Sequence, residues 1–308
     1  MEEKTISIPS IKPIKVLGLV ISPTGYLGKF MVKKFKESGY YVRALVRNIK
    51  KLETEGKFLE PAVNKFVDDI FVGEITKPRT LIGLMDGIDI VFSSIGKTHQ
   101  NDKLTFMDVD YRGNKNLLDL AVSEGIEKFI YIAMLKDRRF RDLDVVKAKE
   151  KFVDELERSG LNYIVIRPNG FFSDMAEFFK MAKGGYIFLI GNGEKKINPI
   201  SADDLADFCL KNINRNRAEL TVGGKYIYSY NEISRIAFSV LGKKERIIHI
   251  PRFLVKPTIP IVKVFSENIG LFLEFLYTVL TNDIITEEKF GNNNLEEFFI
   301  KLNEKLKY

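Results

Sequence analysis

The first half of the chain alternates short apolar runs with amphipathic helical stretches, and this alternation limits the fold more than any other feature. Residues 15–21 form an apolar run, as expected of a strand buried on both faces. Leu27, Met31 and Phe35 then recur four residues apart, on one face of a helix. Further strands are expected at 40–46, 69–73, 89–95, 128–134 and 162–167, and further helices at 105–123 and 144–159. This alternation predicts an α/β fold, a Rossmann-like doubly wound parallel sheet with right-handed crossovers.

Beyond residue 168 the alternation becomes irregular. Short strands are expected at 186–190, 195–200, 220–222 and 246–250, and helices at 202–212 and 231–241. Two helical segments, near 253–280 and 294–306, close the chain. We therefore predict a Rossmann-like domain over residues 1–168 and a mixed α/β C-terminal lobe with closing helices over residues 169–308, packed over the carboxyl ends of the strands.

The charge distribution argues against a nucleic-acid partner. The 308 residues include 48 Lys and Arg against 41 Asp and Glu, a net charge of +7. The basic residues are interleaved with acids, without the clusters or zinc-finger spacing of a nucleic-acid reader. The chain has only two histidines and one cysteine, so no metal site is expected. A single cysteine, Cys209, excludes an internal disulfide and fits a cytoplasmic location.

Stable membrane insertion is not expected either, because no stretch reaches the roughly 18 uncharged apolar residues of a spanning helix. The most apolar stretch, 253–280, is interrupted by Lys256, Lys263, Glu267 and Glu274. Such amphipathic helices more often form core or dimer surface than membrane contact. A contact lying on a membrane surface stays open as the alternative.

A glycine-containing turn follows the first expected strand. Residues 22–28 read SPTGYLG, so Ser22 stands where the full G-x-x-G-x-x-G pattern has its first glycine. Glycines let the backbone approach a pyrophosphate, and the helix that follows aims its free N–H groups at the phosphates. The turn predicts cofactor contacts at Ser22, Thr24, Gly25, Tyr26, Leu27 and Gly28, with a purely structural turn as the alternative.

The ends of the later strands add further contacts to the same crevice. Arg47 ends the second strand where NAD-preferring folds carry an acid, and Lys51 lies just beyond it. A guanidinium there suits a 2′-phosphate, which favours NADP(H) over NAD(H); a solvated arginine is the alternative. Glu74 is expected beside the adenine, and Ser94, Ile95 and Gly96 along the cofactor.

The sequence also resembles a known family. The stretches that carry the resemblance include 24–28, 42–47, 109–114, 159–163, 166–170, 198–206 and 290–296. Together they are similar to the atypical short-chain dehydrogenase/reductases of the NmrA-like and isoflavone-reductase-like branch, over nearly the whole chain. The resemblance implies a Rossmann-like fold, NADP(H) binding and often reduction of a quinone, enone or related small molecule.

The catalytic positions depart from that family. Ala133 stands where members have a serine, and Val145 stands four residues before Lys149, where they have a tyrosine. The usual asparagine falls near Asp110. Lys149 alone matches, which implies a contact to the nicotinamide ribose and a part in protonation; a lysine on a solvated helix face is the alternative. His99 is a weaker candidate for the proton donor, and Pro168 is expected to border the nicotinamide.

Three functions are compatible with these residues. The first is reduction by NADPH of a small apolar carbonyl, enone or quinone, bound between the sheet and the C-terminal lobe. Phe171, Phe172, Phe178 and Phe179 could line that pocket, although their spacing favours core packing for most of them. The second is a non-catalytic NADP(H) sensor or scaffold that binds a protein partner, and the third an assembly or membrane-peripheral factor. A homodimer is compatible with all three.

Overall fold

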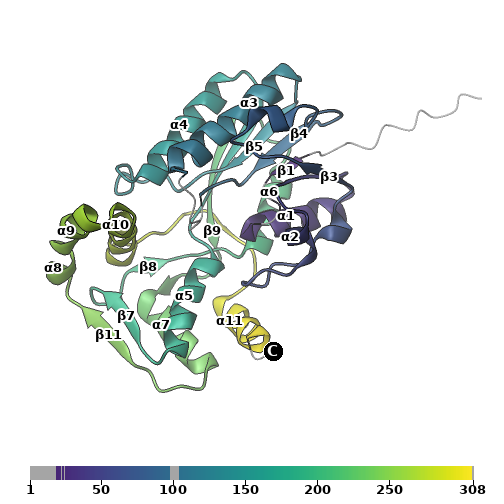
Figure 1. Ribbon diagram of the computed structural model, residues 1–308. Helices are drawn as coiled ribbons and strands as arrows, with labels where there is room; N and C mark the ends of the chain where they lie inside the picture. Colours follow the sequence, from purple (N-terminus) through teal and green to yellow (C-terminus); the bar gives the residue numbers. More distant parts are fainter. Residues whose placement is uncertain (1–18, 22, 24, 98–103, 307–308) are drawn as a thin grey trace, which may run out of the picture.

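The computed structural model describes residues 19–21, 23, 25–97 and 104–306. Its centre is an eight-stranded sheet whose neighbouring strands are all parallel (Figure 1). In spatial order the strands are β12 (Lys289–Phe290), β9 (Ala218–Gly224), β6 (Asn162–Pro168), β5 (Lys128–Ile132), β4 (Ile90–Ser93), β1 (Leu19–Ile21), β2 (Arg43–Val46) and β3 (Asp69–Val72). The order reverses between β1 and β4, so the ligand crevice is expected at the carboxyl ends of these two strands.

Helices cover both faces of this sheet (Figure 1). On one face α1 (Tyr26–Glu37) packs against α6 (Ala202–Lys211), and Phe35 and Leu205 belong to the same buried core. On the other face α3 (Asn114–Ser123) and α4 (Asp144–Arg158) bury Leu117 and Phe152 in a second core. The Rossmann-like doubly wound sheet predicted from the sequence is confirmed.

Short elements connect the strands at the edge of the sheet. They are α2 (Lys50–Glu53), η1 (Asn64–Phe66), η2 (Pro78–Leu81) and η3 (Met107–Gly113). The last is a π-helical turn that leads directly into α3. A helix was predicted over 105–123, but its widened first part could not be foreseen from apolar spacing.

The C-terminal lobe surrounds a core of its own. Strand β7 (Ile187–Ile190) pairs in parallel with β11 (Ile247–Ile250), and β8 (Lys196–Ile197) pairs antiparallel with β10 (Tyr228–Ser229). The helices α5 (Phe172–Lys183), α7 (Tyr230–Val240) and α11 (Leu295–Lys305) bury Phe179, Phe238 and Phe299. The segment predicted at 253–280 divides into α8 (Arg252–Val255), α9 (Thr258–Phe265) and α10 (Glu267–Thr281).

The chain after residue 168 also returns to the main sheet. Residues 220–222, assigned to the lobe from the sequence, instead belong to β9, which pairs with β6. The reason is that β6 offers an open parallel edge, which a short apolar strand can extend. The domain boundary at residue 168 stays a prediction.

Candidate functional site

The predicted phosphate-binding turn leads into a helix whose N-terminus is suited to an anion. Gly25 is the N-cap of α1 and provides no side-chain cap, and the first turn contains no acidic residue. The positive end of the helix dipole is therefore not neutralised from within the helix. Leu27 and Gly28 are buried, and the Tyr26 ring packs edge-to-face against Phe171, 5.9 Å between centroids. Ser22 and Thr24 lie outside the described residues.

The predicted adenine end brings charges of both signs together. Arg47 is exposed directly after β2, and Lys51 is exposed on α2. Glu74, after β3, forms an ion pair with Lys77 at 2.8 Å and accepts a hydrogen bond from the Thr76 hydroxyl. The hydrogen bond from Lys77, together with the more distant charge of Arg47, lowers the pKa of Glu74. Glu74 is thus an ionised neighbour of Arg47.

The centre of the site is a buried ammonium group. Lys149 is 8% exposed on the sheet-facing side of α4, whereas Lys147 on the same helix is exposed. The Lys149 Nζ lies 3.0 Å from Asp110 Oδ1 and donates to the Ile95 carbonyl oxygen at 3.3 Å. A buried amine with these partners is not a solvated lysine on a helix face, so that alternative reading of Lys149 is wrong.

Asp110 supplies the opposite charge from the π-helical turn η3. Its side chain is fully buried, and its Oδ2 accepts a hydrogen bond from the Lys97 backbone N–H at 2.8 Å. Among the described residues, Oδ1 has the ion pair with Lys149 but no well-directed hydrogen bond. A widened helical turn is a frequent feature of functional sites, and here it places a carboxylate under the loop after β4.

The Tyr131 hydroxyl completes this cluster, and sequence reasoning did not single it out. Tyr131 is fully buried on β5, and Lys149 Nζ lies 3.4 Å from its hydroxyl oxygen. Burial raises the pKa of Tyr131 to about 12, so the phenol is neutral at pH 7. Burial alone would lower the pKa of Lys149, but the oxygens of Tyr131 and Asp110 outweigh burial and raise it, which keeps the ammonium charged.

Gly96 leaves little space beside this cluster. A Cβ atom on Gly96 would lie 3.0 Å from Asp110 Oδ1 and 3.3 Å from Lys149 Nζ. Ile95, whose side chain is buried, presents its carbonyl to the lysine, and Ser94 is half-buried beside it. The strand-end residues 94–96 thus surround the ammonium group, and a side chain at position 96 would push against the ion pair.

The positions of the missing serine and tyrosine are occupied by apolar packing. Ala133 follows β5 and donates its N–H to the Ile166 carbonyl. Val145 packs into a small apolar cluster that includes Phe140 and the α10 residue Phe275. Pro168 is buried at the carboxyl end of β6, where it was expected.

The ion-pair network of Arg167 was also missed from the sequence. Its guanidinium is fully buried and donates to both carboxylate oxygens of Glu150, at 2.5 and 3.0 Å. The same group donates to Glu219 at 2.8 Å and to the Met134 carbonyl at 2.6 Å. Because Glu150 follows Lys149 directly, this network fixes the turn of α4 that carries the ammonium group. The pairing of Arg167 with residues 17 and 52 positions away has no local sequence signal.

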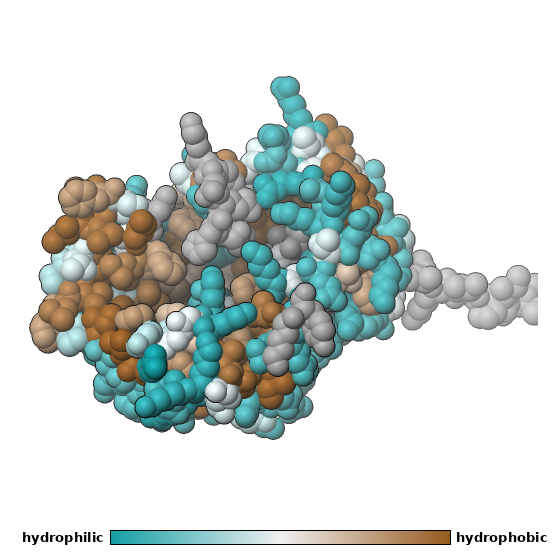
Figure 2. Space-filling model, turned by 60° about the horizontal axis from the view of Figure 1, so that its bottom comes forward, coloured by the Kyte–Doolittle hydropathy of each residue, from teal (hydrophilic) through white to brown (hydrophobic). Residues whose placement is uncertain are grey.

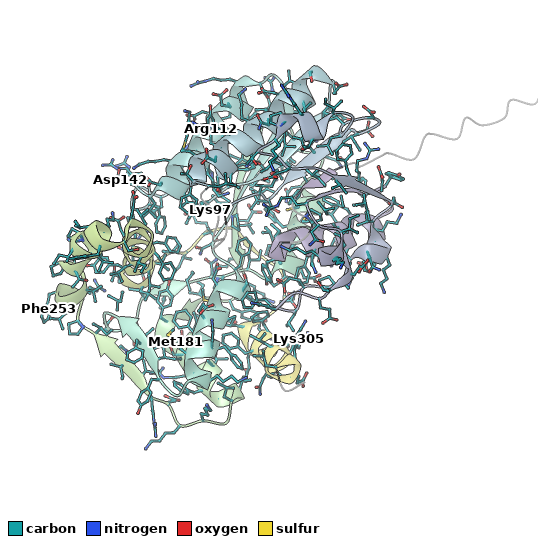
Figure 3. The ribbon with its side chains drawn as sticks, viewed as in Figure 1. Lys97, Arg112, Asp142, Met181, Phe253 and Lys305 are labelled. Atoms are coloured by element: carbon teal, nitrogen blue, oxygen red, sulfur yellow. The ribbon has the colours of Figure 1, made fainter. Side chains whose placement is uncertain are left out.

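Other candidates fall elsewhere. His99 lies outside the described residues. Lys97, whose backbone N–H donates to Asp110, lies between the α3–α4 layer and the lobe (Figure 3). His249 is on β11 and contacts Asn231 at 2.9 Å. Phe172, Phe178 and Phe179 are buried in the core of the lobe, as their spacing favoured.

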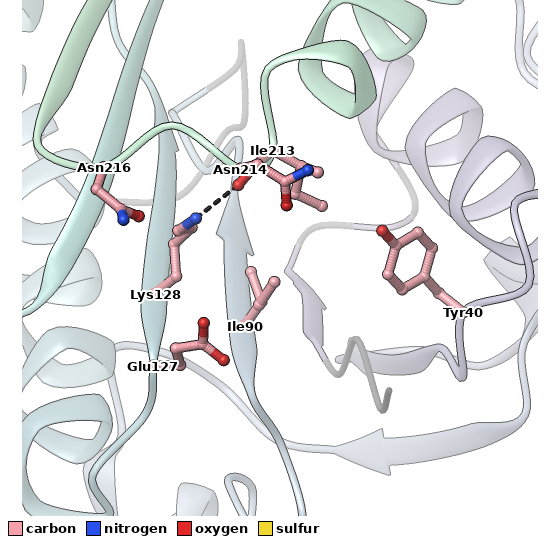
Figure 4. A pocket seen from close by; sticks show the side chains of 7 residues that line it. All are labelled: Tyr40, Ile90, Glu127, Lys128, Ile213, Asn214 and Asn216. Atoms are coloured by element: carbon pink, nitrogen blue, oxygen red, sulfur yellow. Dashed lines mark hydrogen bonds between the residues drawn. The ribbon is translucent and has the colours of Figure 1, made fainter. Parts of the chain in front are cut away.

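A cavity of about 100 Å³ lies at the opposite end of the sheet (Figure 4). Its wall includes Ile90 and Lys128, which begin β4 and β5. The Lys128 ammonium group donates to the Ile213 carbonyl oxygen at 2.6 Å. Because ligands of this fold bind beyond the carboxyl ends of the strands, this cavity is separate from the candidate site.

Comparison with known proteins decides the family. A family model described as NAD(P)H-binding matches residues 23–216. The chain belongs to this NAD(P)H-binding family. The match includes the α1 N-terminus, Asp110, Tyr131 and Lys149, and the resemblance to atypical short-chain dehydrogenase/reductases is confirmed.

Two curated relatives span most of this NAD(P)H-binding chain. The photosystem II assembly factor Ycf39 of Cyanophora paradoxa is 23% identical over 289 residues, which cover 91% of this chain and 85% of the relative. The chloroplastic divinyl chlorophyllide a 8-vinyl-reductase of Arabidopsis thaliana is 26% identical over 328 residues, covering 95% and 78%. One relative is named for assembly and the other for reduction.

Solved structures share the fold of this NAD(P)H-binding protein. The NADPH-dependent quinone oxidoreductase QOR2 of Escherichia coli, complexed with NADPH, has a TM-score of 0.70 at 13% identity and covers 94% of this chain and 99% of its own. The UDP-glucose 4-epimerase of Thermotoga maritima has a TM-score of 0.67 at 14% identity, covering 94% and 98%. At these identities the likeness concerns the fold alone.

Proposed function

We propose that the chain is an NADPH-dependent reductase of a small apolar carbonyl, enone or quinone compound, and that Lys149 holds the ribose next to the nicotinamide. The observation that carries the proposal is the buried ammonium of Lys149 between Asp110 and the Ile95 carbonyl. A charged amine in this position at the carboxyl edge of the sheet can donate hydrogen bonds to sugar hydroxyls in exchange for its long contacts to Ile95 and Tyr131, at 3.3 and 3.4 Å. The family model and the uncapped N-terminus of α1 support a dinucleotide at the same edge.

The residues present fit such a cofactor. When bound, NADPH would supply the hydride. The α1 N-terminus and Gly25 would bind its diphosphate, and Arg47 with Lys51 its 2′-phosphate. Lys149 would orient the ribose, and orientation is the larger requirement of hydride transfer. Ser94, Ile95, Gly96 and Pro168 would border the cofactor along the ends of β4 and β6, and Glu74 its adenine.

Proton delivery in this proposal does not use the two usual hydroxyls, because positions 133 and 145 are Ala133 and Val145. The Tyr131 phenol is neutral at pH 7 and accepts a hydrogen bond from Lys149, so we assign it to positioning the amine. The Lys149 ammonium can still polarise a water molecule or a ribose hydroxyl. Acceptors whose reduced form spreads its negative charge, such as quinones and conjugated alkenes, depend least on a strong local acid. The relative that reduces a vinyl group supports this class of acceptor.

A second candidate is a non-catalytic NADP(H)-binding assembly factor with a protein partner. The same two apolar positions favour it, as do the relatives named as photosystem II assembly factors. Turnover separates the two candidates. Cofactor binding without NADPH oxidation by any quinone, enone or carbonyl acceptor would support the assembly role.

Lys149→Met with Lys147→Met as its control tests the reductase. Both lysines are on α4, but only Lys149 is buried. We expect Lys149→Met to lower the rate of NADPH oxidation by about 100-fold, in the range of a lost positioning or acid–base group, and Lys147→Met to leave it within twofold. Equal rates for wild type and Lys149→Met would refute the assigned role.

Arg47→Ala tests the cofactor preference. Loss of a charge-assisted contact to the 2′-phosphate removes about 1.5–3 kcal/mol of binding free energy. We expect NADP(H) to bind more weakly by roughly ten- to 100-fold, and NAD(H) to be little affected. Calorimetric titration with both nucleotides measures this difference, and equal losses for the two would contradict the assignment.

A further inference from the structure

A cluster of large apolar side chains lies exposed on the C-terminal helices. We call this cluster the apolar patch; its residues are between 54% and 86% exposed and comprise Phe253, Leu254, Ile261, Val264, Phe265 and Ile269. They come from α8, α9 and α10, which lie next to each other at one side of the molecule (Figure 1). Figure 2 shows hydrophobic surface gathered at that side. A contiguous exposed apolar surface rimmed by polar residues is typical of an interaction site on a folded protein.

The patch is not left over from core packing. The opposite side of α10 already packs inward, where Tyr277, Val279 and Leu280 join the core of the lobe. Phe275 on the same helix contacts Phe140, with 6.2 Å between ring centroids. The helix is therefore apolar on two sides, one turned to the core and one to the surface. A helix that is apolar nearly all round is usually covered on all sides.

The charges beside the patch identify what covers it. The segment 252–281, which carries the patch, contains three basic residues, Arg252, Lys256 and Lys263, against two acidic residues, Glu267 and Glu274. Lys263 and Glu274 form an ion pair at 2.8 Å and balance each other. Arg252 and Lys256 are exposed on either side of Phe253 and Leu254 in the sequence of α8. Two exposed cations thus accompany the apolar side chains of this helix.

We propose that the apolar patch binds the surface of an anionic lipid bilayer. Exposed Phe, Leu, Ile and Val side chains would enter the boundary between headgroups and acyl chains, and the surrounding Lys and Arg would contact anionic headgroups. The contact is interfacial, since the described residues form no helix that is long and apolar enough to cross a membrane.

A second copy of the chain fits the patch less well. A two-fold dimer would bring Arg252 and Lys256 of both copies to the same interface. Repulsion among these cations opposes association, whereas an anionic surface attracts them. The proposal is independent of the reductase function. The inner side of α10 reaches the candidate site only indirectly, because Phe275 packs with Phe140 and Val145 in one apolar cluster.

Vesicle co-sedimentation of the full chain tests the proposal. The vesicles are pure phosphatidylcholine, or equal parts of phosphatidylcholine and phosphatidylglycerol, at low and at physiological salt. We expect binding to the anionic vesicles that weakens with salt. Each charge near the surface contributes about 1 kcal/mol, so Arg252→Glu/Lys256→Glu should weaken binding by more than about tenfold. Val264→Glu/Phe265→Glu should do the same at constant basic charge.

Ile82→Glu is the matched control, because Ile82 is 77% exposed and lies outside the patch. It should bind vesicles like the wild type. NADPH titration and the thermal unfolding curve show that each variant is folded, and they report on cofactor binding separately. The proposal is overturned if anionic vesicles do not bind the wild type at low salt, or if both patch variants bind like the control. A wild-type dimer that the Val264→Glu/Phe265→Glu variant converts to monomers, without vesicle binding, would instead assign the patch to a second copy.

Discussion

Replacing Asp110 by asparagine separates the charge of the central ion pair from its shape. Asparagine keeps an oxygen that can accept from the Lys97 N–H, but it removes the countercharge 3.0 Å from Lys149 Nζ. At an effective dielectric constant of about 20, two unit charges at this separation attract by about 5 kcal/mol. Asparagine also avoids the free-energy cost of burying a charged carboxylate, and this offsets part of the loss. Breaking a buried pair from one side costs about 3–5 kcal/mol in measured cases, and we expect about 3 kcal/mol here.

The loss has an upper bound. Lys149 can release its proton once it is unpaired, and neutralising a lysine of ordinary pKa at pH 7 costs about 5 kcal/mol. Because both side chains are buried, salt should screen the pair very little. The destabilisation of Asp110→Asn should therefore be nearly the same at low and high ionic strength, unlike that of an exposed ion pair.

The assay is urea unfolding at pH 7 followed by circular dichroism, in a double-mutant cycle with Lys149→Met. The Asp110→Asn/Lys149→Met variant should be more stable than the sum of the two single losses predicts, by about 2 kcal/mol. Lys147→Met in place of Lys149→Met is the control and should add to Asp110→Asn without coupling. Additive losses for Asp110 and Lys149, within about 0.5 kcal/mol, would show that the pair does not stabilise the fold.

Three further changes test the surroundings of this pair. Gly96→Ala puts a Cβ against Asp110 and Lys149 and should cost about 1–3 kcal/mol of unfolding free energy, with weaker NADP(H) binding by calorimetry; unchanged values for both would contradict the close approach. The pKa of Tyr131 is raised by burial to about 12, above its unfolded value of about 10, so its stabilisation is complete below pH 10 and is lost as the pH rises from 10 to 12. Tyr131→Phe should therefore reduce the slope of unfolding free energy against pH in that window, and an unchanged slope would refute the assignment. Arg167→Met leaves two carboxylates without their shared cation and should lower the urea stability by about 3–5 kcal/mol; full rescue by Arg167→Lys would show that the forked geometry is unimportant.

The sheet could be predicted from the sequence because its strands have local signals. The runs at 89–95 and 128–134 contain the continuous apolar stretches 90–92 and 129–134, as expected of strands buried on both faces, and they form β4 and β5 at the centre. The order of strands at the far edge has no such signal. Whether residues 220–222 extend the main sheet or a small sheet in the lobe depends on which edge is open, and no local pattern records that.

A comparison of Lys149 with Lys147 shows which part of the site could be predicted from the sequence. Val146, Lys149, Val153 and Leu156 recur three or four residues apart, and all four are buried. Lys149 therefore lies on the apolar face of α4, while Lys147 lies off it. A charged residue in an apolar stripe predicts a buried partner, but it does not identify which one. Asp110 is brought to Lys149 by a π-helical turn, and such a turn has no recognisable residue pattern.

The nature of that partner bears on the chemistry that the site can perform. An asparagine beside Lys149 would leave the ammonium charge uncompensated and available to stabilise an anion on a substrate. Asp110 instead makes the buried pair neutral overall, so at a distance its field is that of a dipole and falls off faster than that of a single charge. Under the proposed function, Lys149 then contributes more by holding the ribose than by stabilising a negative charge on the acceptor. A reductase with such a pair, and with Val145 where a tyrosine would stand, is best suited to acceptors that delocalise the incoming charge themselves.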